Sequence, residues 1–459
     1  MIEKFYEWIK RRPMAVKEWI SRIKDSLWFR PVLWLIGMAL LAFGFVAVDW
    51  FFISAEAWDD MSFLFQSHVE GARTMLGAVI GATLTVASLA FSLMMVVVIQ
   101  AANAYTPRLL HRFVADTHNH HVMGVLLGGF IYSIIVLRSL RDEPTVFIPQ
   151  LALNVSVLIS VFALIALISF IHHVASSIEV GNIISLIEEQ TTKLITGTSY
   201  RRVGQCLAPF TPTGEHRVVY SNGSGYVRVL DVKLLEDMTK DSDMVIQMHC
   251  SVGDHLIVGS RLLTVWGEKS HDDKWCERAH DIFVTGNERS WVQDEAYGLQ
   301  QLTDISLRAL SPGINDPTTG IMGLDSLTQL LGAILIRGPR SAYRELEEGG
   351  RLIFLKSDME DACVNYLWPI FDYGQEDCAV VRALVYNLGE LGLLAHDASQ
   401  RDILWRMLCD MHARIDSNQW SGQQIEVLDD LFAQAHDKFG HGEAFAPLGA
   451  QERHTASAL

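Results

Sequence analysis

The feature that most limits how this chain can fold is an uncharged apolar stretch at 75–102. A helix needs about 20 apolar residues to cross a hydrocarbon core of roughly 30 Å, so this stretch is long enough to span a membrane. Small and hydroxylated residues recur along it at helical spacing, at Gly77, Gly81, Thr85, Ser88 and Ser92. We expect the helix face that they share to meet protein or water.

Further apolar runs predict an integral membrane protein with a four-helix α transmembrane domain at 31–178. The four expected spans lie at about 31–52, 74–102, 120–138 and 147–174. The third is short, but Gly124, Gly128 and Gly129 would allow close helix contact. Residues 1–30 are basic and have the pattern of an amphipathic segment at the membrane interface.

Basic residues predict the orientation of these spans. Eight Lys and Arg precede the first span, whereas the loop between the first two spans contains only Arg73. Because cytoplasmic flanks are enriched in Lys and Arg, the N-terminus is expected in the cytoplasm, and four crossings return the C-terminal region there. The six cysteines all follow the spans without a CxxC pair, which is typical of reduced cytosolic thiols.

The remaining residues predict a cytoplasmic α+β region, because their charges and their short apolar runs require a separate core. Helical spacing indicates a linking helix at 179–200. Strand-like alternation of apolar and polar residues, with Gly-containing turns, indicates a small β barrel-like module at 201–270. Residues 271–437 predict a mainly helical domain, and 438–459 a flexible tail.

Two stretches of the β module, GYVRVLDV at 225–232 and SVGDHLIVGSRLLTV at 251–265, are similar to half-motifs of the biotinyl and lipoyl type of barrel. Carrier domains of that type hold their cofactor on a lysine at a hairpin tip. The resemblance would imply such a lysine in this chain. No lysine occurs between Lys240 and Lys269. We therefore expect a structural version of the module, without a cofactor.

A tight turn joins two helices expected at 291–310 and 317–336. Ser311, Pro312 and Gly313 would end the first helix, and Asp316 would cap the second, with Pro317 at its first position. The exposed N–H groups beside Asn315, Asp316, Thr318 and Thr319 could receive an anion. The alternative is that the turn only caps itself. Asp304 and Arg308 stand in a favourable i, i+4 order on the first helix.

This turn carries a resemblance to a known family. LRALSPGINDPTTG, preceded by QDEAYGLQQLTDIS and with FSLMMVVVIQAANAYTPRLL and GGFIYSIIVLRSL upstream, resembles a family of predicted bacterial membrane proteins classified as a domain of unknown function. The likeness covers roughly residues 30–435. It implies a four-span protein of the bacterial inner membrane with a cytoplasmic tail, and it brings no activity, substrate or catalytic residue.

Charge and motifs exclude several functions. A formal charge of −16 without a basic cluster after residue 30 argues against a nucleic-acid partner. The sequence contains no GxSxG elbow, HExxH helix or P-loop, so we expect no enzyme and assign no catalytic, cofactor-binding or metal-ligating residue. A histidine patch at His118, His120 and His121 could bind a metal or sense pH, although a solvated loop explains it more simply.

Two functions remain. The first is a homo-oligomeric channel or passive transport protein, in which Thr85, Ser88 and Ser92 line a pathway and the cytoplasmic domain acts as a gate or vestibule. The second is a membrane-anchored sensor or scaffold that binds a ligand or partner through its cytoplasmic domain. Because small residues also let transmembrane helices approach, ordinary packing of the second span is an equal alternative. The expected partners are lipid and further copies of the chain; the sequence identifies no ligand or ion.

Overall fold

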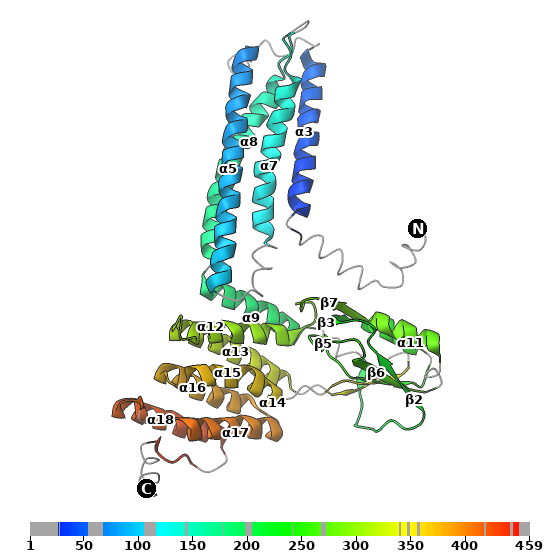
Figure 1. The fold of residues 1–459 in the computed structure, drawn as a ribbon, viewed down its shortest axis with the longest axis vertical. Helices are drawn as coiled ribbons and strands as arrows, with labels where there is room; N and C mark the ends of the chain where they lie inside the picture. Colours follow the sequence, from blue (N-terminus) through cyan, green and yellow to red (C-terminus); the bar gives the residue numbers. More distant parts are fainter. Residues whose placement is uncertain are drawn as a thin grey trace. The chain divides into compact units, whose positions relative to one another are not determined.

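The computed structural model describes residues 26, 28–53, 68–104, 116–142, 146–177, 179–197, 204–240, 242–267, 272–338, 341–346, 349–355, 359–416, 419–440 and 444–448. Most of the expected interface segment at 1–30 and the last eleven residues of the expected tail (449–459) lie outside this set. The chain divides into two compact units, and the sequence passes from one to the other between Glu179 and Val180. Figure 1 labels the elements of both.

The first unit is a bundle of four long helices. These are α3 (Phe29–Ile53), α5 (Val69–Ala104), α7 (Thr117–Ser139) and α8 (Gln150–Ser177). α7 packs against the other three. The outward faces of α3 and α8 carry large exposed side chains such as Leu40, Phe43 and Ile168, as expected for helices in contact with lipid.

Glycines bring the helices of this bundle close together. A Cβ atom at Gly124 or Gly128 would meet the side chains of Trp34 or Met38 on α3, and one at Gly129 would meet Ile159 on α8. The close contact predicted for these three glycines is confirmed. Small residues at a helix interface let the backbones approach, which supplies van der Waals contact where lipid provides no hydrophobic driving force.

Buried polar groups in the bundle find partners on neighbouring helices. The carboxylate of Asp49 accepts hydrogen bonds from the N–H groups of Leu151 (3.2 Å) and Ala152 (3.0 Å), so it caps the start of α8. The hydroxyls of Ser133 and Ser156 lie 2.8 Å apart. These bonds avoid the cost of an unsatisfied polar group in an apolar bundle.

A fifth helix of the described residues, α13 (Pro317–Arg337), is also long and apolar enough to cross a membrane by length and composition. It belongs to the second unit, where it packs against α9 (Val180–Thr196), α12 (Glu295–Leu310) and α16 (Cys378–Leu394). Its leucines at 324, 327, 330 and 331 are completely buried there. Its apolar character is therefore that of a central core helix.

Two sheets form the β part of the second unit. The larger has the order β1-β8-β9-β4-β6-β2 and the smaller the order β5-β3-β7. Among the described strands most neighbours are antiparallel, and only β4 and β9 pair in parallel. The strands are β1 (Gln205–Cys206), β2 (His216–Tyr220), β3 (Gly225–Leu230), β4 (Val245–Met248), β5 (His255–Leu256), β6 (Arg261–Trp266), β7 (Phe283–Gly286), β8 (Tyr343–Glu345) and β9 (Arg351–Ile353).

The β part therefore extends beyond the expected module at 201–270. β7 pairs with β3, β8 pairs with β1, and β9 pairs with β4, although all three come later in the sequence. Short strands separated by many residues leave no local turn signal, so their pairing is decided by the shared core. That core includes Ile246, Leu263, Val265 and, from β9, Leu352.

The remaining elements of this unit are helical. They are α10 (Val232–Thr239), α11 (Asp273–Ala279), a 3₁₀ turn (His280–Ile282), α14 (Met359–Ala362), a π-helical turn (Cys363–Leu367), α15 (Trp368–Gly374), α17 (Ala398–Arg414) and α18 (Gly422–Phe439). Small residues again set the closest approach. A Cβ atom at Gly298 of α12 would collide with the completely buried Thr191 of α9.

Two expected boundaries differ from the structure. The helix expected from 291 begins at Glu295. Asp294 is its N-cap, because its side chain accepts the N–H of Tyr297 in the first turn of the helix. The tail expected from 438 contains residues that pack on the helices within the part that the structure describes. Phe439 and Leu448 are buried, and Phe445 stacks on Trp405 and His412.

We expect Gly298→Ala to destabilise the protein, because the new methyl group must displace Thr191. Overpacking of this kind costs about 1–3 kcal/mol, and the midpoint of thermal unfolding of the full-length protein in detergent should fall. Gly422→Ala, at a helical position with open space around it, should leave the midpoint unchanged or raise it. Adding Thr191→Ala to Gly298→Ala should recover part of the lost stability. If the losses of the two single variants simply add in the double variant, residues 191 and 298 are not in contact.

Candidate functional site

The five residues of the small stripe (Gly77, Gly81, Thr85, Ser88 and Ser92) are all exposed on the surface of the protomer. The buried residues of α5 include Ala72, Leu76, Ala87, Ala90 and Met94. At roughly 100° per residue, the stripe lies about 150° around the helix from them. The stripe is thus not used for packing within the described part of its own bundle.

The surface of this stripe is open and its hydroxyls bond locally. A Cβ atom at Gly77 or Gly81 would meet nothing within 4 Å. Thr85 donates to the carbonyl of Gly81 at 2.8 Å, and Ser92 donates to the carbonyl of Ser88 at 2.9 Å. Their donors are satisfied within the helix, while the oxygen lone pairs stay directed outward, so the stripe can pack closely or offer acceptors.

The helix–turn–helix residues form a self-capped turn. The carboxylate of Asp316 accepts the N–H of Thr319 at 3.1 Å and its hydroxyl at 2.6 Å, and these hydrogen bonds hold the pKa of Asp316 below its ordinary value. Ser311 donates its hydroxyl to the carbonyl of Arg308, and Asn315 takes a positive φ of 51°. A carboxylate already holds the N–H end of α13, where an incoming anion would bind.

The other predicted residues of this region lie apart from any cavity wall described below. Thr318 and Arg308 are exposed, and Asp304 is half-buried. The hydrogen bonds that form the turn come from its own residues, such as the N–H of Asp316 to the carbonyl of Ala309 at 2.8 Å. These contacts favour a structural role for the turn.

Histidines that are distant in the sequence meet at one end of the membrane unit. His173 Nε2 lies 2.6 Å from Asp116 Oδ2, and the rings of His118 and His173 lie 4.4 Å apart. Trp34 donates its indole N–H to His121 at 2.9 Å. Within the described residues, no group of three or more His, Cys, Asp or Glu side chains is arranged to hold a metal ion.

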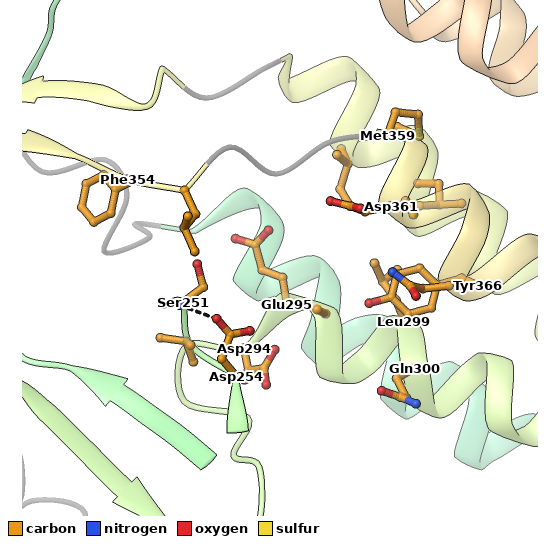
Figure 2. A pocket seen from close by; sticks show the side chains of 18 of the residues that line it. Ser251, Asp254, Asp294, Glu295, Leu299, Gln300, Phe354, Met359, Asp361 and Tyr366 are labelled. Carbon is orange, nitrogen blue, oxygen red and sulfur yellow. Dashed lines mark hydrogen bonds between the residues drawn. The ribbon is translucent and has the colours of Figure 1, made fainter. Parts of the chain in front are cut away.

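A cavity of about 530 Å³ lies within the second unit, where the sequence analysis placed no site. Its walls come from the turn before β5, the start of α12, the end of α13, the residues after β9, α14, the π-helical turn and α17. Figure 2 shows side chains from the turn before β5, the start of α12, the residues after β9, α14 and the π-helical turn around it. The volume falls within the roughly 300–1,000 Å³ of small-molecule sites.

A buried ion pair forms one wall of this cavity. The guanidinium of Arg289 contacts Asp294 through two hydrogen bonds, of 2.7 and 2.8 Å, and donates a third to Gln300 at 3.1 Å. The side chain of Asp294 is 1% exposed and that of Arg289 is 17% exposed. Burial raises the pKa of Asp294, and the guanidinium opposes this shift.

The backbone of the β part closes over this pair. Gly253 has a φ of +96°, and a Cβ atom there would lie 2.7 Å from both Arg289 Nη2 and Asp294 Oδ2. A glycine is needed because only a residue without a side chain fits both the conformation and the space. The turn before β5 therefore packs directly on this pair at the start of α12.

A second ion pair lies on the neighbouring wall. Arg337, the last residue of α13, donates to Glu295 at 2.9 Å. Glu295 lies in the first turn of α12, where a negative charge is favourable, and Arg337 lies in the last turn of α13, where a positive charge is favourable. Both cationic side chains that line the cavity are thus already paired with carboxylates.

Sequence reasoning missed this cavity because no motif marks it. Its charged residues come from separate parts of the chain, and their types are common at helix ends. The π-helical turn lines the cavity through Tyr366, whose pKa is raised by burial and by the nearby Asp294 and Asp361. Such turns occur frequently at functional sites, but the sequence does not reveal them.

Replacing Arg289 by Met should destabilise the second unit strongly. The substitution leaves the buried carboxylate of Asp294 without its partner, a loss of about 3–5 kcal/mol. As a matched control, Arg217→Met breaks an exposed pair with Asp273 that is worth at most about 1 kcal/mol. Thermal unfolding of the two full-length variants compares them, and equal midpoints would show that the Arg289–Asp294 pair is not important for stability.

Comparisons with known proteins place the chain. Residues 24–390 match the family model described as predicted membrane protein (DUF2254). Two similar relatives are the uncharacterized protein Mb1321c of Mycobacterium bovis and the uncharacterized protein Rv1290c of Mycobacterium tuberculosis. Each is 28% identical over 355 residues, which are 74% of this chain and 67% of the relative. No solved structure matches. The chain belongs to the DUF2254 family of predicted membrane proteins.

Proposed function

We propose that this membrane protein is a homo-oligomeric channel or passive transport protein of the bacterial inner membrane. The face of α5 that bears Gly77, Gly81, Thr85, Ser88 and Ser92 would meet other copies or line the pathway. The second unit would gate it from the cytoplasm. Both termini would lie on the cytoplasmic side, as the basic residues before the first span favour.

One observation carries this proposal: the small, hydroxylated face of α5 points away from the helices of its own bundle. Had it packed against α7 or α8, the stripe would be explained within one protomer. If this stripe faced lipid, its Gly and Ser residues would offer the lipid little apolar surface. If it faced a second helix, the same small residues would let that helix approach closely. A closed ring of copies would bring these faces together around an axis.

The absence of an ionisable residue in the span at 75–102 favours a passive pathway, because coupled pumps usually carry charged relays at membrane depth. We assign no enzyme activity. The alternative function is a membrane-anchored sensor or scaffold, which is favoured by the cavity of about 530 Å³ in the second unit. The two functions are compatible if ligand binding controls gating.

Purified protein in planar bilayers should conduct, and Ser88→Leu should reduce the conductance, because a larger apolar side chain would narrow and dry the pathway. Single-channel recording measures the effect. Ala82→Leu adds a similar side chain at an exposed position of the same helix outside the stripe, and it should change conductance less. A monomeric mass together with no conductance under voltage, tension or ligand would refute the channel function.

The proposed orientation can be tested through Cys206, which is exposed on β1. Burial raises the pKa of Cys250 and Cys363 to about 12, so both thiols stay protonated and inaccessible at neutral pH. We expect a membrane-impermeant maleimide to label Cys206 rapidly in inverted membrane vesicles and not in intact spheroplasts. Cys206→Ser should remove the rapid phase of labelling, and rapid labelling in spheroplasts would reverse the assigned orientation.

A further inference from the structure

The cavity of the second unit contains more negative charge than its own cations neutralise. Arg289 pairs with Asp294 and Arg337 pairs with Glu295. Two more carboxylates, Asp254 and Asp361, line the same cavity. In the part of the chain that the structure describes, Asp254 accepts the N–H of Ser251 at 2.7 Å, and neither carboxylate pairs with a cationic side chain.

These two carboxylates face the cavity from opposite walls. Asp254 belongs to the turn before β5, and Asp361 belongs to α14. Figure 2 shows Asp254 on the side of the β part and Asp361 on the side of the helices, with Glu295 between them. Both residues are exposed, so they stand where a molecule entering the cavity would meet them first.

A hydrogen-bond acceptor in the same wall also lacks a partner. The amide oxygen of Gln400, on α17, is buried and has no hydrogen-bond partner among the described residues. A buried acceptor left unsatisfied costs free energy, and a donor from a bound molecule would remove that cost once the Gln400 side chain turns toward the cavity. This second observation is independent of the carboxylates and also calls for a ligand that donates hydrogen bonds.

Part of the remaining lining is apolar or aromatic, beside polar side chains such as Gln293, Gln300 and Asn365. Leu299, Leu331 and Ile334 line the cavity together with Phe354 and Tyr366. Methylene groups would pack against these side chains, whereas a hydrated metal ion would gain nothing from them. Among the described residues, no three or more His, Cys, Asp or Glu side chains are grouped so that they could hold a metal ion.

We propose that this cavity binds a small organic cation with at least two amino groups joined by methylene chains. Its ammonium groups would bind Asp254 and Asp361, one N–H would reach Gln400, and the methylene groups would pack on the apolar wall. The bound cation would join the β part to the helices across the cavity. This proposal does not depend on whether the membrane unit conducts.

Spermidine is the probe, titrated by calorimetry into full-length protein in nanodiscs of uncharged lipid at constant ionic strength. We expect saturable binding of one molecule per chain. Asp361→Asn and Asp254→Asn should each weaken it at least about fivefold, because a charge-assisted hydrogen bond becomes a neutral one. Both substitutions keep the side-chain shape, and in Asp254→Asn the new amide oxygen can still accept the N–H of Ser251. Gln400→Leu should also weaken binding.

Asp430→Asn serves as the matched control, because it removes one exposed carboxylate on α18 outside the cavity. It should leave the affinity within about twofold of the unmodified protein. Equal weakening by Asp430→Asn would mean that spermidine binds only the general negative charge, and the proposal would be wrong. Absence of saturable binding, or saturable binding of ATP in place of spermidine, would also overturn it.

Discussion

The buried pair between Arg289 and Asp294 is the interaction on which the second unit depends most. It joins the strand-rich part to the helical part, since Asp294 also caps α12 and the backbone of Gly253 closes over both charges. Separating two charges from water is costly, and only their mutual contact and hydrogen bonds offset this cost. The pair therefore requires the turn before β5 and the start of α12 to keep a fixed position relative to each other.

In the membrane unit, the corresponding constraint is the lack of water. Every helix must satisfy its own backbone, and helices associate through close packing of small residues. Gly124, Gly128 and Gly129 serve this purpose within the bundle. The equivalent small residues of α5 face outward, and this difference between two glycine-containing helices is the reason for proposing an assembly of several copies. A protomer alone leaves the face of α5 without a packing partner among the described residues.

Both proposed sites are surfaces that lack a partner within one chain, but they differ in chemistry. The face of α5 is small and the hydroxyls of Thr85 and Ser92 donate to its own backbone, so it favours another helix or a permeating solute. The cavity of the second unit has excess carboxylates and an unsatisfied amide oxygen, so it favours a donor of positive charge. A protein with both would be able to couple the concentration of a small cation to a change in its membrane unit.

The sequence by itself determined the elements whose signals are local. Apolar length fixed the long helices of the first unit, glycine spacing identified the contact surface of α7, and Asp316 with Pro317 marked the start of α13. Alternation located most of the strands, because a period of two is imposed by the pleat itself. It did not predict that β7, β8 and β9 would complete sheets begun much earlier in the chain.

Only the tertiary structure decided which residues meet. Asp254, Asp294, Asp361 and Gln400 are ordinary polar residues in four different segments, and only folding places them around one cavity. The sequence also did not decide what the α5 stripe faces. Residue spacing shows which residues share a helix face, but not which part of the molecule that face contacts. The physical reason is the same in both cases: local periodicity depends on nearby residues, whereas burial, charge balance and contact depend on distant parts of the chain.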